Sequence, residues 1–350
     1  MSPHLSCEMA SAPSCRSLAR LAVVAALLWL VFARLFLSPL IKSRAKHCLR
    51  LPVGRNVTRT SSAASFVLLW STDAASFSLR SRRCVESILY HHPSAAVRVY
   101  SNQLPRTFFA AFRRAGFDIR VHRYNVTELL LDTPAAAWLE RLAEWERGPY
   151  FYSHVTDAVR LALLFRVGGV YLDTDVILTR PIRLTAAEPL GAPAIEGPPA
   201  LHDALGVESY ADTRTGLPTL NGAIMAFGRG SRFLWNCLHE FAADYRADRW
   251  GWNGPELLTR VQARCAHADG AAVQVEPPER FYPIHWSAVA DFADGQHPQA
   301  DARMWATIER SSYAVHVWNR KAANLSFADG SLLYRLHNTF TVLPARERCT

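Results

Sequence analysis

The sequence predicts an α/β fold with a mostly parallel central sheet. Short apolar stretches at residues 66–70, 97–100 and 119–122 predict strands. The segments between them, at residues 80–90 and 107–115, have the spacing of amphipathic helices. Strands that alternate with helices at this spacing are typical of βαβ units, in which consecutive strands run parallel.

The N-terminal part differs from the rest in charge and in hydropathy. Residues 1–60 contain nine of the 39 lysines and arginines but only one acidic residue, so the remaining chain is nearly neutral and shows no nucleic-acid-binding surface. We expect a short tail at 1–20, a transmembrane signal-anchor at 21–41 and a stem at 42–63, followed by one catalytic domain at 64–350. A cleaved signal peptide is the alternative for the apolar segment.

Two signals disagree about the side of the membrane on which the domain lies. Lys42, Arg44 and Lys46 follow the apolar segment, and the positive-inside rule would place them in the cytosol. Three Asn-x-Ser/Thr sequons, which are glycosylated only in the secretory pathway, point to the lumen. These predicted glycosylation sites are Asn56, Asn125 and Asn324.

The seven cysteines contain no Cys-x-x-Cys pair, which argues against a zinc site. Five of them follow the apolar segment, so one or two disulfides are possible in an oxidising compartment, but the pairing cannot be deduced. Alternatively, Cys84 and Cys237 are small buried hydrophobic residues.

The most informative motif is an Asp-x-Asp. It follows a predicted helix at residues 153–167, whose N-cap would be Ser153, and the Gly-Gly pair that ends this helix. The run from Gly168 to Ile177 predicts one buried strand that carries Asp173 and Asp175 near its end. Side chains two positions apart on a strand face the same way, so both carboxylates would converge on one point. Oxygen ligands of this kind suit Mg²⁺ or Mn²⁺, which share their other positions with phosphates. The alternative is a pair of solvated aspartates in a turn.

Other candidate residues lie before and after this motif. Asp157 and Arg160 are three positions apart on the helix, so they share a face and form either a surface ion pair or a site for sugar hydroxyls and phosphate. Further strands are predicted at 220–227, opened by Asn221 and Gly222, and at 313–319, which contains His316. Helices are predicted at 231–245 and 255–266, and the turn between them carries Trp250 and Trp252, whose rings suit stacking on sugars.

Three kinds of protein fit these residues. A glycosyltransferase would use a cation at the two aspartates to neutralise a leaving nucleoside diphosphate. An aspartyl-phosphate phosphatase would use them as nucleophile and acid/base, although such motifs open their domain and Ile177 stands where Thr or Val is expected. A membrane-tethered lumenal binding protein without turnover is the third possibility.

The order of several motifs resembles one glycosyltransferase family. The run from Asp157 to Asp175 is similar to the donor-binding block of the sugar-binding-region Asp-x-Asp glycosyltransferases, family 32. Downstream blocks resemble the α-1,4-galactosyltransferases, and a block near Cys84 is closer to plant-type members. These downstream blocks are Leu220-Asn221-Gly222-Ala223, Gly254-Pro255-Glu256-Leu257-Leu258-Thr259-Arg260-Val261, Phe281-Tyr282-Pro283-Ile284-His285-Trp286 and Tyr313-Ala314-Val315-His316-Val317-Trp318-Asn319.

The resemblance implies a Rossmann-like GT-A fold and a Golgi type II membrane enzyme with a lumenal domain. Its activity would be the transfer of galactose or N-acetylgalactosamine, with retention and in α-1,4 linkage, from a UDP-sugar to a glycolipid or glycan acceptor. The resemblance implies that Asp173, Asp175 and His316 bind the metal, Mn²⁺ or Mg²⁺. It implies that Asp157 and Arg160 bind the donor sugar and that Asn221 and Gly222 border it. It also implies that Tyr171 contacts the ribose and that the uridine is contacted by Trp70, Ser71 and Thr72. Without the resemblance, His316 fits a buried core histidine. His285 could contact the acceptor, although the family more often has Pro there.

The predicted chemistry does not require a general base. In a retaining transfer, the departing phosphate oxygen can take the acceptor proton on the same face of the sugar, whereas an inverting enzyme needs a base on the opposite face. A double displacement would need a carboxylate beneath the anomeric carbon. Asp157 is expected to hold sugar hydroxyls instead.

Overall fold

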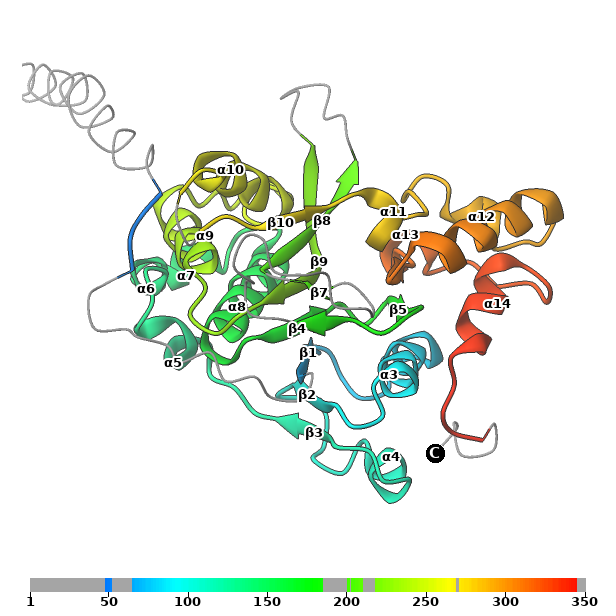
Figure 1. Ribbon diagram of the computed structural model, residues 1–350. Helices are drawn as coiled ribbons and strands as arrows, with labels where there is room; N and C mark the ends of the chain where they lie inside the picture. The colour runs from blue at the N-terminus through cyan, green and yellow to red at the C-terminus, as the bar shows by residue number, and fades with distance from the viewer. Residues whose placement is uncertain are drawn as a thin grey trace, which may run out of the picture. The chain divides into compact units, whose positions relative to one another are not determined.

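A seven-stranded sheet forms the centre of the computed structural model, which describes residues 48–51, 65–184, 200–201, 203–209, 218–268 and 271–344 (Figure 1). The strand order is β10-β8-β9-β4-β1-β2-β3, and only β9 runs antiparallel to its neighbours. This confirms the predicted mostly parallel sheet. Its strands are β1 (Ser65–Leu69), β2 (Ala96–Tyr100), β3 (Ile119–His122), β4 (Gly169–Leu172), β8 (Ala204–Ser209), β9 (Thr219–Phe227) and β10 (Gln274–Glu276).

Helices cover both faces of the sheet because its central strands are apolar on both sides. In β1, Phe66 and Leu68 pack into the cluster that contains α3 and α4, whereas Val67 and Leu69 pack into the cluster that contains α8, α9 and α10. The longer helices are α3 (Leu79–His91), α8 (Phe151–Val167), α9 (Arg232–Ala243), α10 (Pro255–Cys265), α12 (Pro298–Ser311) and α14 (Leu332–Thr339). The shorter ones are α4 (Ala110–Arg114), α5 (Val126–Leu131), α6 (Ala136–Leu139), α7 (Leu142–Trp145), α11 (Pro278–Phe281), α13 (Asn319–Ala322) and the 3₁₀ helix η2 (Val289–Phe292).

Two small two-stranded sheets complete the described part. One pairs β5 (Val176–Leu178) with β11 (Ala314–His316) in antiparallel register, and the other pairs β6 (Arg183–Leu184) with β7 (Ala200–Leu201). A third apolar cluster surrounds the first of these small sheets and contains Ile177, Val315 and side chains of α12 and α14. The C-terminal segment is thereby packed against the chain that follows the Asp-x-Asp motif.

The glycine pair after α8 is required by the geometry of the sheet. Gly168 and Gly169 have φ values of 67° and 111°, a region that L side chains rarely adopt. A Cβ atom at Gly169 would lie 2.4 Å from the carbonyl oxygen of Ser65 on the neighbouring β1. The predicted N-cap is wrong, because α8 begins two residues before Ser153 and its cap, Tyr150, makes no side-chain hydrogen bond.

The prediction of one continuous strand through the Asp-x-Asp motif is also wrong. Strand β4 ends at Leu172, and β5 begins at Val176 in a different sheet. Asp173 and Asp175 therefore lie in a turn, which the Val176 N–H closes by donating to the Asp173 carbonyl oxygen at 3.1 Å. The carboxylates come together because the chain changes sheets, not because they share a strand face.

The predicted segments at 107–115 and 313–319 are shorter than expected. Residues 107–109 form turns before α4, and β11 stops at His316. The strand stops because Trp318 has a left-handed φ of 56° and leads directly into α13. Among the described residues, it is the one non-glycine residue with a positive φ.

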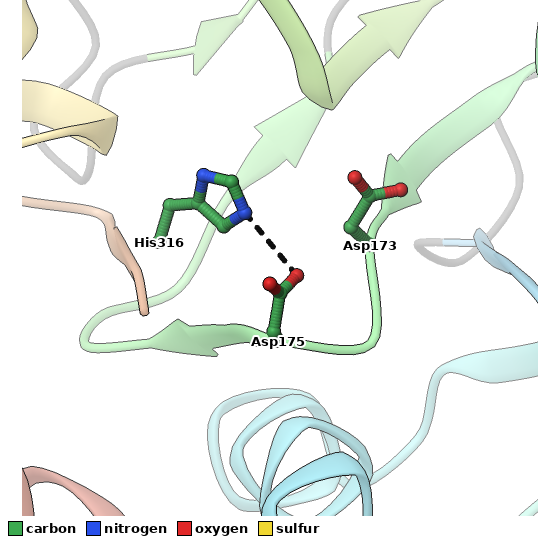
Figure 2. A group of neighbouring side chains, drawn as sticks. All are labelled: Asp173, Asp175 and His316. Atoms are coloured by element: carbon green, nitrogen blue, oxygen red, sulfur yellow. Dashed lines mark ion pairs between the residues drawn. The ribbon is translucent and has the colours of Figure 1, made fainter. Parts of the chain in front are cut away.

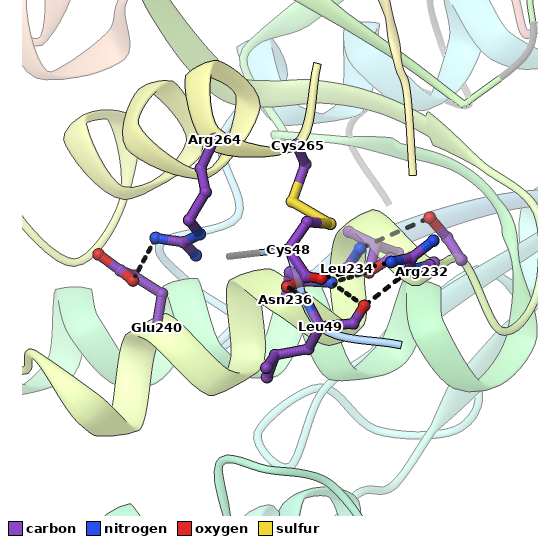
Figure 3. The surroundings of a disulfide bond; sticks show 9 residues. Cys48, Leu49, Arg232, Leu234, Asn236, Glu240, Arg264 and Cys265 are labelled. Carbon is purple, nitrogen blue, oxygen red and sulfur yellow. Dashed lines mark hydrogen bonds and ion pairs between the residues drawn. A yellow bond between two sulfur atoms is a disulfide. The ribbon is translucent and has the colours of Figure 1, made fainter. Parts of the chain in front are cut away.

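A disulfide between Cys48 and Cys265 fastens the start of the described chain to the end of α10 (Figure 3). Beside it, Leu49 N donates to Asn236 Oδ1 at 2.7 Å, and Arg232 Nε donates to the Leu49 carbonyl at 2.6 Å. Residues 48–51, which the sequence assigns to the stem, thus belong to the same compact unit as the sheet. Cys84 and Cys237 are buried and free, which confirms the alternative proposed for them.

In the part of the chain that the structure describes, no helix is both long and apolar enough to cross a bilayer. The expected tail and anchor at 1–41 and Asn56 lie outside the described residues, as does the predicted stem apart from residues 48–51.

We predict that Cys265→Ala lowers the free energy of unfolding by about 2–5 kcal/mol, because the disulfide closes a loop between residues 217 positions apart. Thermal or urea denaturation measures the change, and Cys237→Ala provides a control with a buried cysteine that is not bonded. Equal sensitivity of the wild type and Cys265→Ala to dithiothreitol would contradict the pairing.

Candidate functional site

Two carboxylates and one imidazole form a cluster at the turn between β4 and β5 (Figure 2). One ligand atom from each of Asp173, Asp175 and His316 lies within 4.8 Å of the others. His316 Nε2 is 3.2 Å from Asp175 Oδ1, and Asp173 lies beside this pair at the end of β4. The structure therefore brings together the three residues that the sequence predicts as metal ligands.

Asp175 makes three contacts with the C-terminal segment, residues 316–319. Its backbone carbonyl accepts from Val317 N at 2.9 Å, and its Oδ2 accepts from Asn319 N at 2.7 Å. The third contact is the ion pair with His316. The left-handed conformation of Trp318 turns the chain so that the N–H of the next residue reaches the carboxylate.

The two partners of this pair favour each other's charged form. Burial opposes the charge on Asp175, but His316 and the Asn319 N–H hold the pKa of that carboxyl below its usual value. Burial also opposes charge on His316, yet Asp175 raises the pKa of the imidazole above its usual value. A cation that takes the place of the histidine proton would find the Asp175 carboxylate ionised.

Arg160 connects the cluster to a second buried carboxylate. Its guanidinium lies 3.2 Å from Asp157 Oδ1 and 3.5 Å from Asp173 Oδ1, and it donates to the Gly222 carbonyl at 2.9 Å. Tyr171 also donates to Asp173 Oδ1, at 2.6 Å. The ion pair between Asp157 and Arg160 is therefore part of an interior network, not the surface pair that the sequence left open.

The single positive charge of Arg160 does not fully offset the negative charges of the two carboxylates, Asp157 and Asp173. Burial raises the pKa of Asp157 to about 6, although Arg160 lowers it, and Asp173 adds a further repulsion. Burial lowers the pKa of Arg160, but Asp173, Tyr171 and Asp157 together raise it above its usual value, so the guanidinium stays charged. Gly254 packs directly on Asp157, because a Cβ atom there would lie 2.8 Å from Oδ2.

The network opens into a cleft of about 970 Å³. Its walls include most of the sequence-predicted catalytic and sugar-binding residues, namely Asp157, Arg160, Asp173, Asp175, Asn221, Gly222 and His316. Tyr171 is buried behind them and reaches the site through Asp173. Trp70, Ser71 and Thr72 do not line this cleft; they follow β1, which lies next to β4 in the sheet.

Several cleft residues are absent from the sequence-based prediction. They are Glu208, Trp286, Trp318, Asn319, Arg320 and Lys321, together with Gly251 and Asn253 of the turn before α10. Four of these, residues 318–321, come shortly after His316 in the sequence. The position of that histidine is therefore the signal that could have identified them. Trp250 and His285 line the cleft as the sequence suggested. Trp252 does not, because the guanidinium groups of Arg246, Arg249 and Arg260 lie over its ring at 4.1, 4.5 and 3.9 Å.

The donor set fits a divalent cation that accepts both oxygen and nitrogen ligands. Three polar atoms of the site are buried and have no hydrogen-bond partner among the described residues: His316 Nδ1, Arg160 Nε and Asn319 Oδ1. An imidazole nitrogen or an amide oxygen can ligate a cation, whereas the guanidinium nitrogen can only donate to an acceptor such as a sugar hydroxyl or a phosphate. We therefore identify Asp173, Asp175 and His316 as the residues that would hold the cation.

Two of the three predicted glycosylation sites lie in the described part. Asn125 is exposed and caps α5 by accepting from Glu128 N at 3.2 Å, and Asn324 is exposed after α13. Both are accessible to modification, which remains a prediction.

We predict that Asp175→Asn weakens Mn²⁺ binding at least about 100-fold, since even outer-shell partners of a metal are worth 10–100-fold in affinity. His316→Ala should cost about tenfold, because it removes a neutral ligand. Titration by Mn²⁺ electron paramagnetic resonance in the presence of UDP measures both. Glu256→Gln, a cleft carboxylate outside the cluster, is the control, and equal affinities in all variants would refute the ligand assignment.

Comparisons with known proteins agree with this geometry. Residues 78–193 match the family model "glycosyltransferase sugar-binding region containing DXD motif", and residues 226–340 match "alpha 1,4-glycosyltransferase conserved region". Rat lactosylceramide 4-alpha-galactosyltransferase is 33% identical over 80% of this chain and 74% of its own length. Human alpha-1,4-N-acetylglucosaminyltransferase is 29% identical over 64% of this chain and 58% of its own length.

Among solved structures, the galactosyltransferase LgtC is only distantly similar, with a TM-score of 0.39 and 14% identity over 81% of this chain and 99% of its own. The sequence relatives are much closer, and they confirm the glycosyltransferase hypothesis over the phosphatase and the non-catalytic binding protein. The chain belongs to the α-1,4-glycosyltransferase family with a DXD sugar-binding region, the family of the lactosylceramide 4-alpha-galactosyltransferases.

Proposed function

We propose that this glycosyltransferase transfers galactose, with retention and in α-1,4 linkage, from UDP-galactose to a galactose-terminated glycolipid or glycan. The observation that carries the proposal is the cluster of Asp173, Asp175 and His316 beside the network of Asp157 and Arg160 in one cleft. The names of the relatives support galactose as the transferred sugar, since most of the relatives that match are lactosylceramide 4-alpha-galactosyltransferases.

The residues of the cleft divide into two roles. Asp173, Asp175 and His316 would hold Mn²⁺, which when bound would neutralise the negative charge of the leaving diphosphate. Asp157 and Arg160 would hold hydroxyls of the donor sugar, because the carboxylate accepts hydrogen bonds and the guanidinium donates them. Asn221 and Gly222 would border the same sugar. Trp70, Ser71 and Thr72 would contact the uridine, and the buried Tyr171 would act on the ribose side of the site only by positioning Asp173.

Transfer in this site would proceed without a protein base. The acceptor oxygen bonds to the anomeric carbon as the bond from that carbon to the phosphate oxygen breaks, and the acceptor proton moves to the departing phosphate. Asp157 is already bound to Arg160 and packed under Gly254, so it is not free to act as a nucleophile. The protein contributes positioning and charge stabilisation.

We also propose that the chain is a type II Golgi membrane protein with a lumenal catalytic domain. The disulfide between Cys48 and Cys265 supports a domain that folds in an oxidising compartment. The exposed sequons at Asn125 and Asn324 support the same side of the membrane.

The direct test incubates the purified chain with Mn²⁺, UDP-galactose and lactose, and measures release of UDP. UDP-N-acetylgalactosamine, UDP-N-acetylglucosamine and UDP-glucose are compared as alternative donors. We expect the fastest release with UDP-galactose and an α-linked product in the proton NMR spectrum. A β-linked product, or release of UDP that does not require a divalent cation, would contradict the proposal.

We predict that Gly254→Ala lowers kcat/KM for UDP-galactose by about 100-fold, the scale on which a misplaced binding group acts. The new Cβ would lie 2.8 Å from Asp157 Oδ2 and 3.0 Å from Oδ1, so the carboxylate must shift from its position beside Arg160. Gly251→Ala is the matched control in the same turn, because its Cβ would meet only the flexible end of Glu256, at 3.3 Å. Comparable losses in both variants would show that the turn, not Asp157, is responsible.

A further inference from the structure

Two tryptophans at the cleft are exposed in a way that the donor site does not explain. Trp250 and Trp286 are 49% and 40% exposed, and they are the two tryptophans among the exposed large hydrophobic side chains of the described residues. Both line the cleft that holds the carboxylate cluster. They come from separate segments, one from the turn before α10 and the other from the chain after α11. An indole that stays exposed in a cleft offers a large apolar face to a ligand.

Each ring has a cation over it, and the two cations are adjacent in sequence. The guanidinium of Arg320 lies 5.4 Å from the centroid of Trp250, and Nζ of Lys321 lies 4.9 Å from the centroid of Trp286. Since both cations belong to α13, the two indoles meet at the same short stretch of chain. These contacts help to fix the orientation of both rings.

The same stretch of chain is attached to the predicted metal site. Helix α13 begins at Asn319, whose N–H donates to Asp175 Oδ2 at 2.7 Å. The position of the two indoles is thus linked to that of the carboxylates through only one or two residues. A sugar stacked on these rings would be held at a set distance from the cation and the donor.

We propose that Trp250 and Trp286 form the acceptor subsite and bind two successive sugar rings of the acceptor. This inference rests on the proposed function. A galactose ring has an axial 4-hydroxyl, which leaves a continuous face of C–H groups on the opposite side, and that face stacks on an indole while the hydroxyls remain free to hydrogen-bond. Two platforms suit a disaccharide end better than a single sugar. Polar partners are at hand, because Glu208, Glu256 and His285 line the same cleft.

Tryptophans beside lysine and arginine also occur where proteins touch a bilayer. The structure favours the sugar, because both indoles line a cleft and more than half of each side chain is covered.

The test measures KM for lactose and for methyl β-galactoside in the full chain with saturating Mn²⁺ and UDP-galactose. We expect Trp250→Ala and Trp286→Ala each to raise the KM for lactose about tenfold, the factor expected for losing one aromatic stacking contact. The preference for lactose over the monosaccharide should shrink in both variants. KM for UDP-galactose and the slow hydrolysis of UDP-galactose in the absence of acceptor should stay within about twofold of the wild type. Trp250→Phe and Trp286→Phe should retain most of the lactose affinity, because a smaller aromatic face remains.

Tyr90→Ala provides the control, since Tyr90 is an aromatic residue on α3 that is 51% exposed and does not line the cleft. An unchanged KM for lactose in both tryptophan variants would overturn the inference. So would a loss of binding to anionic vesicles at unchanged KM for lactose, which would identify a membrane contact. If the wild type releases no UDP from UDP-galactose with lactose present, the proposed function fails, and quenching of tryptophan fluorescence by lactose then decides the aromatic subsite alone.

Discussion

The site depends on the attachment of Asp175 to the C-terminal segment of the chain. Three contacts make this attachment, through the Asp175 carbonyl and both of its carboxylate oxygens, and the Asn319 contact spans 144 positions in sequence. They place His316 beside the carboxylates and bring α13 to the cleft. Without them, only Arg160, through its contact with Asp173, would offset the repulsion between the two acidic side chains after β4, since like charges at this separation disfavour each other's ionisation.

Charge balance explains why the surrounding residues are arranged as they are. Asp157, Asp173 and Asp175 crowd around a single guanidinium, Arg160, and one imidazole. The acidic groups of the site thus outnumber the basic ones, and the pKa of Asp157 is raised mainly by burial and further by the repulsion of Asp173. A divalent cation would supply the missing charge, and a bound diphosphate would bring its own negative charge to that cation. The site is therefore expected to bind the charged donor and its metal together more tightly than it binds either one alone.

The sequence was sufficient to predict strands β1, β2, β3, β4 and β9, helices α3, α4, α8, α9 and α10, and the acidic residues Asp157, Asp173 and Asp175 with Arg160 and His316, because apolar periodicity, the Gly-Gly stop and the Asp-x-Asp motif are local signals. It failed where long-range contacts decide the backbone. The turn at Asp173–Asp175 exists because β5 pairs with β11, and the end of β11 depends on the left-handed Trp318. The partner of Cys48 could not be deduced either, since it lies 217 positions away on α10. Arg320 and Lys321 were missed because nothing local distinguishes them from solvated charges.

The most direct test of the central claim is a crystal structure of the chain with Mn²⁺ and UDP, with anomalous scattering recorded at the manganese edge. The account predicts one anomalous peak within coordination distance of Asp173, Asp175 and His316, with the diphosphate oxygens completing the coordination. A peak that lies away from His316, or a diphosphate bound in the cleft without any ion at the turn, would contradict it.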